Sequence, residues 1–299
     1  MIYTLTCNPA LDYVVRMDKF KEGATNRSYG ESIAPGGKGI NVSLVLKNLG
    51  IPTLAMGIAA GFTGDVLLGM LEERGVPADF IRADGFTRIN VKIKTGRESE
   101  INGSGPVLQE SVTEELAKKL AALPENACVV LAGSVPNGLS GDFYARLLGL
   151  VNRRDLRVTV DASGALLVNV LQSRPWLIKP NLEELGEIFG VRFTARDQVE
   201  RYAHRLCEMG ARNVIVSLGG YGAMMINEKG EEMSVPAYIG DVVDTVGAGD
   251  ALVAAFLAAK EMGRTDVEAL RRGVAAGCAT SFKAGLATRA EIEALLKRA

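Results

Sequence analysis

The chain has 299 residues, of which 47% are hydrophobic, and its formal net charge is −1. This charge gives no indication of nucleic-acid binding or of attraction to an acidic membrane surface. No apolar run is long enough to span a bilayer, and residues 1–7 have the pattern of a strand and not of a signal peptide. We therefore expect a cytoplasmic protein with neither nucleic-acid nor membrane partners.

Cysteine and histidine usage disfavours several kinds of site. Cys7, Cys128, Cys207 and Cys278 are far apart in the chain and form no CxxC motif, so we interpret them as reduced thiols. The single histidine, His204, lies on a polar segment that we expect to be a solvated helix face. A zinc site and a Ser-His-Asp triad are both disfavoured.

The first third of the chain combines strands with two short helices. Apolar residues at helical spacing predict a helix over residues 40–49. The other expected elements are a helix at 65–74 and strands at 1–7, 12–20, 25–33, 53–60, 80–83 and 87–95. The strands near 12–33 and 87–101 are half polar and have no helices between them. We expect them to form a small antiparallel sheet that stands off the main body.

From about residue 111 onward, strands alternate with helices. The expected strands are 128–132, 157–161, 176–179 and 214–218, followed by a hairpin over 223–235. The expected helices are 111–123, 140–152, 165–172, 182–189, 196–209, 248–262, 267–282 and 289–297. This alternation predicts an α/β fold with a parallel sheet covered on both faces. The chain contains no linker, repeat or low-complexity tract, so we expect residues 1–299 to form a single domain.

The segment from Asp244 to Asp250 begins as a loop and ends as an apolar helix. Gly247 and Gly249 allow a tight turn, and Asp250 falls in the first turn of the helix. Free amide groups and the helix dipole make such an end attractive to phosphate. Asp250 is thus a candidate general base beside an anion hole. The alternative, a helix start with a dipole-matched aspartate, is equally favoured by this segment alone.

A second glycine-rich turn precedes the helix expected at 40–49. Gly36, Gly37, Lys38 and Gly39 offer free amides and a cation, which suits a phosphate or the edge of a sugar ring. The turn is not a Walker A loop, and no GxGxxG follows a strand, so a dinucleotide-binding dehydrogenase is disfavoured. Taken alone, a glycine turn with a solvated lysine is the favoured explanation.

Polar residues also gather on one face of the strand expected at 87–95. Arg88, Asn90, Lys92 and Lys94 share that face because successive side chains of a strand alternate. These side chains are suited to binding a phosphate. The alternative interpretation, that they form the solvated face of a charged edge strand, is slightly favoured. Asp12 follows the first strand, and ligands of parallel sheets bind beyond the carboxyl ends of strands. It is a candidate acceptor for sugar hydroxyls, or a turn aspartate.

Two further turns follow predicted strands. Asn181 is a good helix N-cap and Glu184 completes a capping-box pair, which explains both residues structurally. The functional alternative places them near a hydrated Mg²⁺ on a nucleotide. The glycines of residues 217–222 allow close approach to nucleotide phosphate or ribose, and the alternative there is a flexible turn before the hairpin.

Taken together, these motifs resemble ribokinase-like (PfkB-type) sugar kinases, and the resemblance spans nearly the whole chain. The motif at 245–250 is highly specific, whereas the others are weak individually and strong jointly. In chain order the motifs are Asn8-Pro9-Ala10-Leu11-Asp12, Gly36-Gly37-Lys38-Gly39-Ile40-Asn41-Val42, Thr87-Arg88-Ile89-Asn90, Gly133-Ser134-Val135-Pro136, Lys179-Pro180-Asn181-Leu182-Glu183-Glu184, Ser217-Leu218-Gly219 and Thr245-Val246-Gly247-Ala248-Gly249-Asp250.

The resemblance implies a three-layer α/β/α sandwich with a mostly parallel sheet and a protruding β-sheet lid. It implies ATP and Mg²⁺ as cofactors and pairing of lids in a homodimer. The implied catalytic residues are the base Asp250 and the anion-hole residues Gly247, Ala248 and Gly249. The implied sugar-phosphate ligands are Asp12, Gly37, Lys38, Asn41, Arg88, Asn90, Lys92 and Ser134. The implied ATP ligands are Lys179, Asn181, Ser217, Gly219 and Gly222, with Glu184 near Mg²⁺.

Within the family, residues 87–92 and 37–41 look most like the 1-phosphofructokinase group. This likeness implies ATP-dependent phosphorylation of fructose 1-phosphate at O6, giving fructose 1,6-bisphosphate. Tagatose-6-phosphate kinase and 6-phosphofructokinase activities are the alternatives within the family. A catalytically silent sugar-phosphate sensor is an alternative of another class, and the intact motif ending at Asp250 argues against it.

Overall fold

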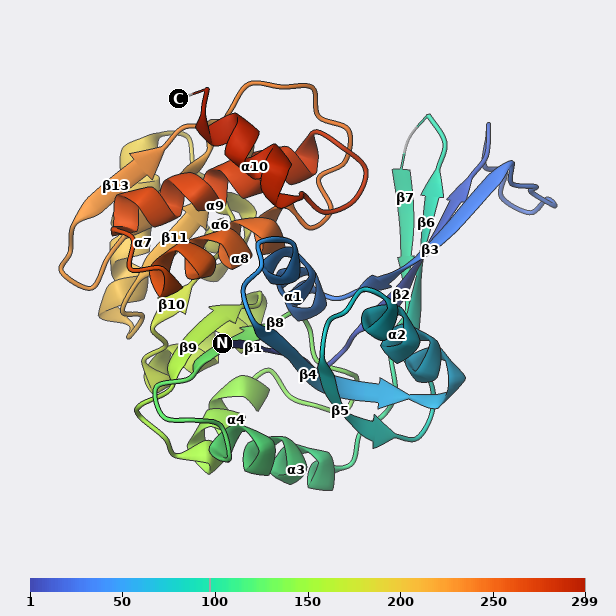
Figure 1. Ribbon diagram of the computed structural model, residues 1–299, viewed down its shortest axis with the longest axis horizontal. Helices are drawn as coiled ribbons and strands as arrows, with labels where there is room; N and C mark the ends of the chain where they lie inside the picture. Colours follow the sequence, from blue (N-terminus) through green and yellow to red (C-terminus); the bar gives the residue numbers. More distant parts are fainter. Residues whose placement is uncertain (97, 299) are drawn as a thin grey trace.

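The computed structural model describes residues 1–96 and 98–298, and within these a nine-stranded sheet forms the centre of the molecule (Figure 1). Its order is β13-β12-β11-β10-β9-β8-β1-β4-β5. The strands are β1 (Ile2–Thr6), β4 (Thr53–Ala60), β5 (Ala78–Ala83), β8 (Cys128–Ala132), β9 (Arg157–Asp161), β10 (Leu177–Ile178), β11 (Val214–Ser217), β12 (Ala223–Ile226) and β13 (Glu232–Val235). Pairing is parallel from β5 across to β11 and antiparallel for the β12–β13 hairpin, which confirms the mostly parallel sheet.

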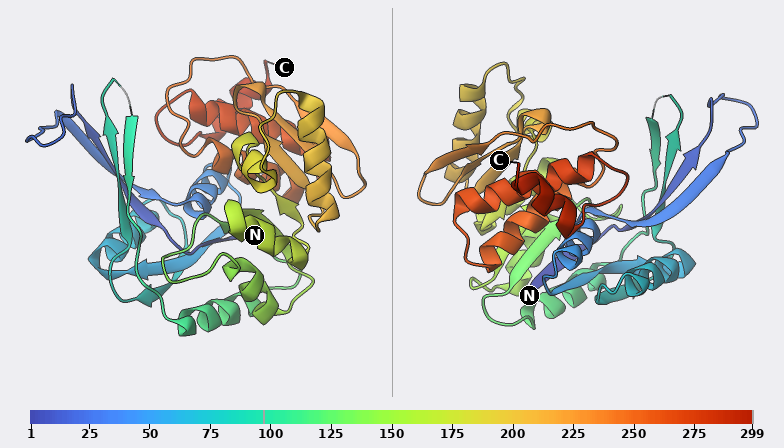
Figure 2. Two further views of the ribbon diagram at one scale, coloured as in Figure 1. Left: turned by 180° about the vertical axis from the view of Figure 1, so that it is seen from behind. Right: turned by 45° about the horizontal axis from the view of Figure 1, so that its top comes forward.

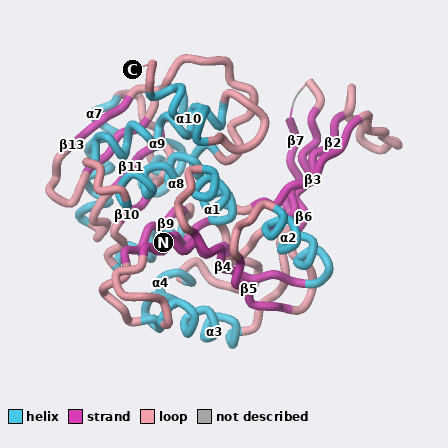
Figure 3. The backbone as a smooth tube through the Cα atoms, in the orientation of Figure 1, coloured by secondary structure: helices cyan, strands magenta, loops and turns pink. Residues whose placement is uncertain are grey.

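Helices cover both faces of this sheet, as expected for alternating strands and helices (Figure 3). They are α1 (Lys38–Asn48), α2 (Gly61–Glu73), α3 (Glu110–Ala121), α4 (Phe143–Val151), α5 (Gly164–Val170), α6 (Leu182–Phe189), α7 (Arg196–Glu208), α8 (Ala248–Glu261), α9 (Asp266–Ser281) and α10 (Arg289–Leu296). Short 3-10 turns lie at Leu171–Ser173 and Gly219–Tyr221. None of the helices described is long and apolar enough to cross a membrane.

The alternation of side chains along β1 divides the core into two layers. Tyr3 and Leu5 pack with apolar residues of α3, α4, α5, α6 and α7 on one face. Ile2 points to the other face, where it packs with α1, α8, α9 and α10. The three-layer α/β/α sandwich is therefore confirmed, and the buried helix α8 lies against its centre.

A smaller sheet projects from the body as a lid (Figures 1 and 2). The described residues place four strands in it, in the order β3-β2-β6-β7. These are β2 (Ala10–Arg16), β3 (Gly30–Gly36), β6 (Arg88–Lys94) and β7 (Glu98–Asn102). The expected antiparallel arrangement is wrong for the central pair, because β2 and β6 are parallel. Both strands follow strands of the main sheet, β1 and β5, and both leave its carboxyl edge in the same direction.

The lid strands are also shorter than expected at their outer ends. The strand expected over 12–20 ends at Arg16, and the one expected over 25–33 begins at Gly30. The intervening segment is mostly exposed and contains several charged residues, and Gly23 turns there with a φ of 71°. The backbone groups of a strand need hydrogen-bonded partners. An alternating polar and apolar pattern therefore does not extend β2 or β3 beyond the residues with which they pair.

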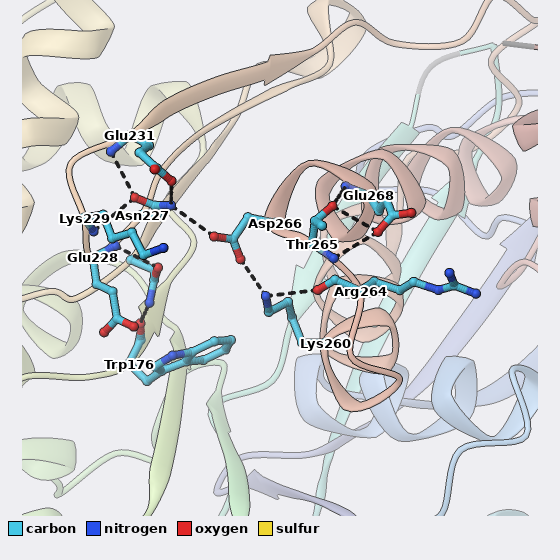
Figure 4. A network of polar contacts seen from close by, with 11 residues as sticks. Trp176, Asn227, Glu228, Lys229, Glu231, Lys260, Arg264, Thr265, Asp266 and Glu268 are labelled. Atoms are coloured by element: carbon cyan, nitrogen blue, oxygen red, sulfur yellow. Dashed lines mark hydrogen bonds and ion pairs between the residues drawn. The ribbon is translucent and has the colours of Figure 1, made fainter.

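A buried asparagine ties the β12–β13 turn to the junction of α8 and α9 (Figure 4). Asn227 is 3% exposed, and its amide nitrogen donates to Glu231 Oε2 (2.6 Å) and Asp266 Oδ2 (3.1 Å). Its side-chain oxygen accepts from the amides of Lys229 and Glu231. Lys260 donates to Asp266 Oδ1 over 2.7 Å, so this network fixes the far end of α8.

Candidate active site

Charged residues gather where parallel strands end and helices begin, on the side of the sheet that faces the lid. Asp161 is the last residue of β9, and Lys179 directly follows β10. Lys38 is the first residue of α1, and Asp250 lies in the first turn of α8. The carboxyl edge of the sheet thus brings together residues that are far apart in the sequence, as expected for a parallel α/β fold.

Asp250 is a buried carboxyl group at the start of α8, with 6% of the residue exposed. Its Oδ2 accepts a hydrogen bond of 2.8 Å from the side-chain amide of Asn41. Burial raises the pKa of Asp250 to about 6, and the negative charge of Asp161 adds to this. Asn41, Lys38 and Lys179 act in the opposite direction. A carboxyl group with this pKa is well matched to general-base chemistry near neutral pH.

The turn before Asp250 is tightly packed. Gly247 is the N-cap of α8 with a φ of 79°, and a Cβ there would lie 2.6 Å from Leu286 Cδ2. The amide of Ala248 donates to the carbonyl of Thr245 over 3.2 Å. A Cβ on Gly249 would lie 3.4 Å from Lys179 Nζ, so the ammonium group lies beside the turn. The helix N-terminus and this cation together favour a bound anion.

Asp161 is a site residue that the sequence reasoning missed. It is 1% exposed, and its Oδ1 lies 2.9 Å from Lys38 Nζ and 3.4 Å from Lys179 Nζ. Burial acts to raise the pKa of Asp161, but Lys179 and Lys38 outweigh it and lower that pKa below its ordinary value. The only local signal was an acidic residue at the end of a buried strand, where ligands of parallel sheets bind.

Lys38 is held by carboxylates of the main body. It donates to Asp161, and its Nζ is 3.7 Å from Glu184 Oε1. Burial acts to lower the pKa of Lys38, but Asp161 and Glu184 reverse this and raise it, so the ammonium group stays charged. Ser134 lies nearby in the loop after β8, because a Cβ on the adjacent Gly133 would lie 3.8 Å from Lys38 Cβ. The ammonium group of Lys38 therefore faces the end of β9 and the start of α6.

Several sugar-binding candidates lie on the inner face of the lid. Asn90 donates to Asp12 Oδ1 over 2.9 Å, and Lys92 Nζ lies 3.6 Å from Asp12 Oδ2. Asp12 and Lys92 line a cavity of about 780 Å³ between the lid and the body, together with Asn41. Asn41 also donates to Asp250, so one side chain connects the wall of this cavity with the candidate base.

Arg88 and Gly37 lie at the base of the lid. The Arg88 guanidinium donates to the carbonyls of Asn8 (3.1 Å) and Gly103 (3.4 Å), so neutral oxygens hold it and its charge is available to an anion. Burial lowers the pKa of Arg88, and Asp12 opposes this. Gly37 caps α1 with a φ of 118°, and a Cβ there would lie 2.8 Å from Thr6 Cγ2. Only glycine fits this position without a shift of the neighbouring strand.

The nucleotide candidates lie at the ends of β10 and β11. Asn181 and Glu184 form a full capping box: Glu184 N donates to Asn181 Oδ1 (2.7 Å), and Asn181 N donates to Glu184 Oε2 (2.8 Å). Ser217 pairs with Asn181 in a parallel bridge. Gly219 faces open space with a φ of 57°, whereas a Cβ on Gly222 would lie 2.1 Å from Val235 O. Gly222 is thus required by the hairpin itself, and Gly219 leaves room for a ligand.

The carboxylates of this region suit a metal ion that is also held by phosphates. The described residues contain no group of three or more metal-ligating side chains. Asp161 Oδ2 is buried and has no hydrogen-bond partner among them, and Glu184 Oε1 is directed toward the same cluster. Mg²⁺ on a nucleotide is typically held by one or two carboxylates and otherwise by phosphates and water, so the donor set fits.

Comparison with known proteins points to one family. The family model described as pfkB family carbohydrate kinase matches residues 6–293. The chain is 41% identical to 1-phosphofructokinase from Bacillus subtilis over 297 residues, covering 99% of this chain and 97% of the relative. It is 35% identical to D-tagatose-1-phosphate kinase from Bacillus licheniformis, covering 96% and 94% of the two chains.

Solved structures of phosphofructokinase-2 from Escherichia coli have a very similar fold. The structure with fructose-6-phosphate has a TM-score of 0.92 at 28% identity and covers 99% of this chain and 98% of the other. A structure described as the tetrameric inhibited form has a TM-score of 0.93 at 29% identity, with the same coverage. The likeness therefore extends over both the body and the lid.

Proposed function

Because the chain belongs to the pfkB family of carbohydrate kinases, we propose that it transfers the γ-phosphoryl group of ATP to O6 of fructose 1-phosphate. The products are fructose 1,6-bisphosphate and ADP. The observation that carries the chemistry is Asp250, a buried carboxyl group with a pKa of about 6 at a helix N-terminus. The identity of the acceptor is supported by the 41% identical 1-phosphofructokinase of Bacillus subtilis.

In the proposed reaction, Asp250 takes the proton of the O6 hydroxyl as O6 attacks the γ-phosphorus. The O6–P bond forms, the bond between the γ-phosphorus and the ADP oxygen breaks, and the proton stays on the carboxyl group. Asn41 holds Oδ2 of Asp250, which orients the carboxylate for this transfer. The turn at Gly247, Ala248 and Gly249 and the adjacent Lys179 stabilise negative charge on the moving phosphoryl group.

The acceptor lies, in this proposal, between the lid and α1. Asp12 accepts hydrogen bonds from the hydroxyl groups of the sugar, and the side-chain amide of Asn90 donates to them. Gly37 allows the backbone to approach the sugar ring. The existing phosphate lies at the end of the sugar away from Asp250, where Arg88, Lys92 and Ser134 bind it. Arg88 is the principal ligand because its guanidinium is held only by neutral carbonyls in the contacts described above.

ATP lies over the ends of β10 and β11, against Asn181, Ser217, Gly219 and Gly222. We propose that Mg²⁺ accompanies it, with Glu184 and Asp161 as the protein carboxylates nearest to it. The metal ion supplies positive charge to the phosphates when it is bound. Lys38 and Lys179 contribute fixed charges from the protein side, which keep Asp161 ionised in this buried position.

D-tagatose 1-phosphate is the second candidate acceptor, because a relative of that specificity is 35% identical to this chain. Phosphorus NMR of the product tests the proposal. With ATP, Mg²⁺ and fructose 1-phosphate, we expect a second phosphate ester on C6 and an equal amount of ADP. ADP release without a new ester, or no reaction with any ketohexose phosphate, would contradict the kinase assignment.

We also propose a cytoplasmic homodimer that forms through the lids. On the outer face of the lid, Tyr13 pairs with Ile33 and Val91, and Val91 pairs with Ile101, so these side chains share one face. Ile33 and Ile101 are 42% and 60% exposed, and such an apolar face is suited to a second copy. Light scattering should give a dimer for the wild type and a monomer for Ile101→Lys. Met209→Lys, on an exposed apolar residue of the body, is the control and should remain dimeric.

A further inference from the structure

One ion pair connects the lid to the segment that leads into the candidate anion hole. Lys94 is the last residue of β6, and its Nζ lies 2.8 Å from Oδ2 of Asp244. Glu98, on β7, is a weaker partner at 3.7 Å. The Lys94 and Asp244 side chains are 25% and 19% exposed, so the contact is partly shielded from water. Lys94 thus joins the lid to the turn that precedes Gly247.

The other carboxylate oxygen of Asp244 shapes this turn. Asp244 Oδ1 accepts a hydrogen bond of 3.0 Å from the amide of Val246, a short-range bond typical of aspartate in turns. The amides of Val243 and Asp244 donate to the carbonyl of Ser281, at the end of α9. The turn is therefore attached to the body through its backbone and to the lid through one side chain.

Charges around the pair favour its ionised form. Burial acts to raise the pKa of Asp244, but the bonds from Lys94 and from the Val246 amide outweigh it and lower that pKa. The bond to Asp244 raises the pKa of Lys94, while Arg16 acts in the opposite direction. Lys92, the next inward-facing lysine of the strand, adds further positive charge near Asp244.

We propose that Lys94 is a positioning residue that couples the lid to the anion-binding turn. With the lid in place, the ammonium group fixes the Asp244 carboxylate, which then holds the Val246 amide and the backbone entering Gly247. When the lid moves away, the carboxylate loses this partner and the turn is less restrained. Phosphoryl transfer thereby depends on a contact between the lid and the turn that precedes Gly247. The proposal rests on the kinase activity of the family and not on the identity of the acceptor.

The test compares Lys94→Met with Asp244→Asn and with the double variant. Asp244→Asn removes the charge but keeps a side-chain oxygen for the Val246 amide. We expect each single variant to lower kcat roughly tenfold, with little change in KM for ATP, as for loss of one charge-assisted hydrogen bond. The double variant should be no slower than either single one, because both remove the same contact.

Two further variants separate positioning from general stability. Lys94→Arg keeps the charge and should restore most of kcat. Glu98→Gln removes the weaker partner of Lys94 and should leave kcat unchanged. Rates are measured with the best acceptor from a ketohexose phosphate panel, so a wrong substrate assignment leaves the comparison intact. Additive losses in the double variant, or a wild-type kcat in Lys94→Met, would overturn the proposal.

Hydrogen exchange gives a readout that needs no substrate. In Lys94→Met, amides of residues 245–249 should exchange faster than in the wild type, while those of β8 should not change. Unchanged exchange in the turn would also overturn the proposal, even if no acceptor supported turnover. A complete absence of wild-type turnover would instead contradict the proposed function.

Discussion

The side-chain amide of Asn41 donates a 2.8 Å hydrogen bond to Oδ2 of Asp250, although the two residues are 209 positions apart. The bond connects the first turns of α1 and α8, the two helices that begin with glycine-rich turns. It favours the charged carboxylate, against burial and the charge of Asp161. Asn41 therefore orients the candidate base and lowers its pKa, as Lys38 and Lys179 also do.

Asp250→Asn should lower kcat by about 10²–10⁴, the usual contribution of a positioned general base. The amide has nearly the same shape as the carboxyl group, and Lys38, Lys179 and the helix N-terminus remain in place. We expect KM values within a few-fold of the wild type. Steady-state kinetics on a variant with a wild-type circular dichroism spectrum would check this. Near-normal turnover would remove Asp250 from the role of base.

The rate should depend on pH through the same carboxyl group. Since a base must be deprotonated, kcat should rise with pH through about 6 and level off above it. Removing the hydrogen bond in Asn41→Ala should raise the pKa of Asp250, because that bond favours the charged form. The acidic limb of the profile should then move to higher pH.

The second ionisation of a phosphate ester also lies near pH 6, so the displacement between wild type and variant is the decisive quantity. Asn48→Ala is a matched control on the same helix, because Asn48 bonds to the carbonyl of Ala287 and not to Asp250. The acidic limb of the pH profile of Asn48→Ala should stay at the wild-type pH. An acidic limb that does not move in Asn41→Ala would show that another group controls the profile.

Arg88→Ala should raise KM for the sugar phosphate strongly and leave KM for ATP nearly unchanged. Hydrogen bonds to a charged group are typically worth ~1.5–3 kcal/mol, or roughly tenfold to a hundredfold in affinity. Arg88→Lys should recover little, because lysine cannot reproduce two parallel bonds to one phosphate. A loss of ATP affinity with normal sugar affinity would mean that the two substrates are placed the wrong way round.

Asn227→Ala should reduce the free energy of unfolding by about 2–4 kcal/mol, because it removes the hydrogen bonds that a buried side chain makes to Lys229, Glu231 and Asp266. Urea denaturation would measure the loss. Asn169→Ala is the control: it removes an exposed bond to the Gly141 carbonyl and should cost under about 0.5 kcal/mol. If Asn227→Ala also lowered the free energy of unfolding by less than about 0.5 kcal/mol, the hairpin network would be dispensable for stability.

Local sequence patterns predicted the elements that carry their own signals. Helix α6 lies at Leu182–Phe189 as expected, because Asn181 and Glu184 provide a complete capping box before an apolar face. Gly247 and Asp250 were identified because a glycine turn followed by strong helix formers specifies a helix start. Such signals lie within a few residues of each other and need no knowledge of the tertiary fold.

Contacts between distant segments could not be predicted in this way. Asp161 carries no local motif, and its importance follows only from two lysines that the sheet brings to it. The parallel pairing of β2 with β6 depends on both strands leaving the same edge of the main sheet. Likewise, Lys94 was placed on the correct face of its strand, but its partner Asp244 lies 150 positions away.

A comparison of kcat/KM across sugar phosphates decides whether this site phosphorylates a ketohexose 1-phosphate. The panel contains fructose 1-phosphate, D-tagatose 1-phosphate, fructose 6-phosphate and tagatose 6-phosphate, each with ATP and Mg²⁺. We expect the highest kcat/KM for fructose 1-phosphate and its near loss in Asp250→Asn. A higher kcat/KM for either 6-phosphate would show that a ketohexose 1-phosphate is not the acceptor for which this site is built.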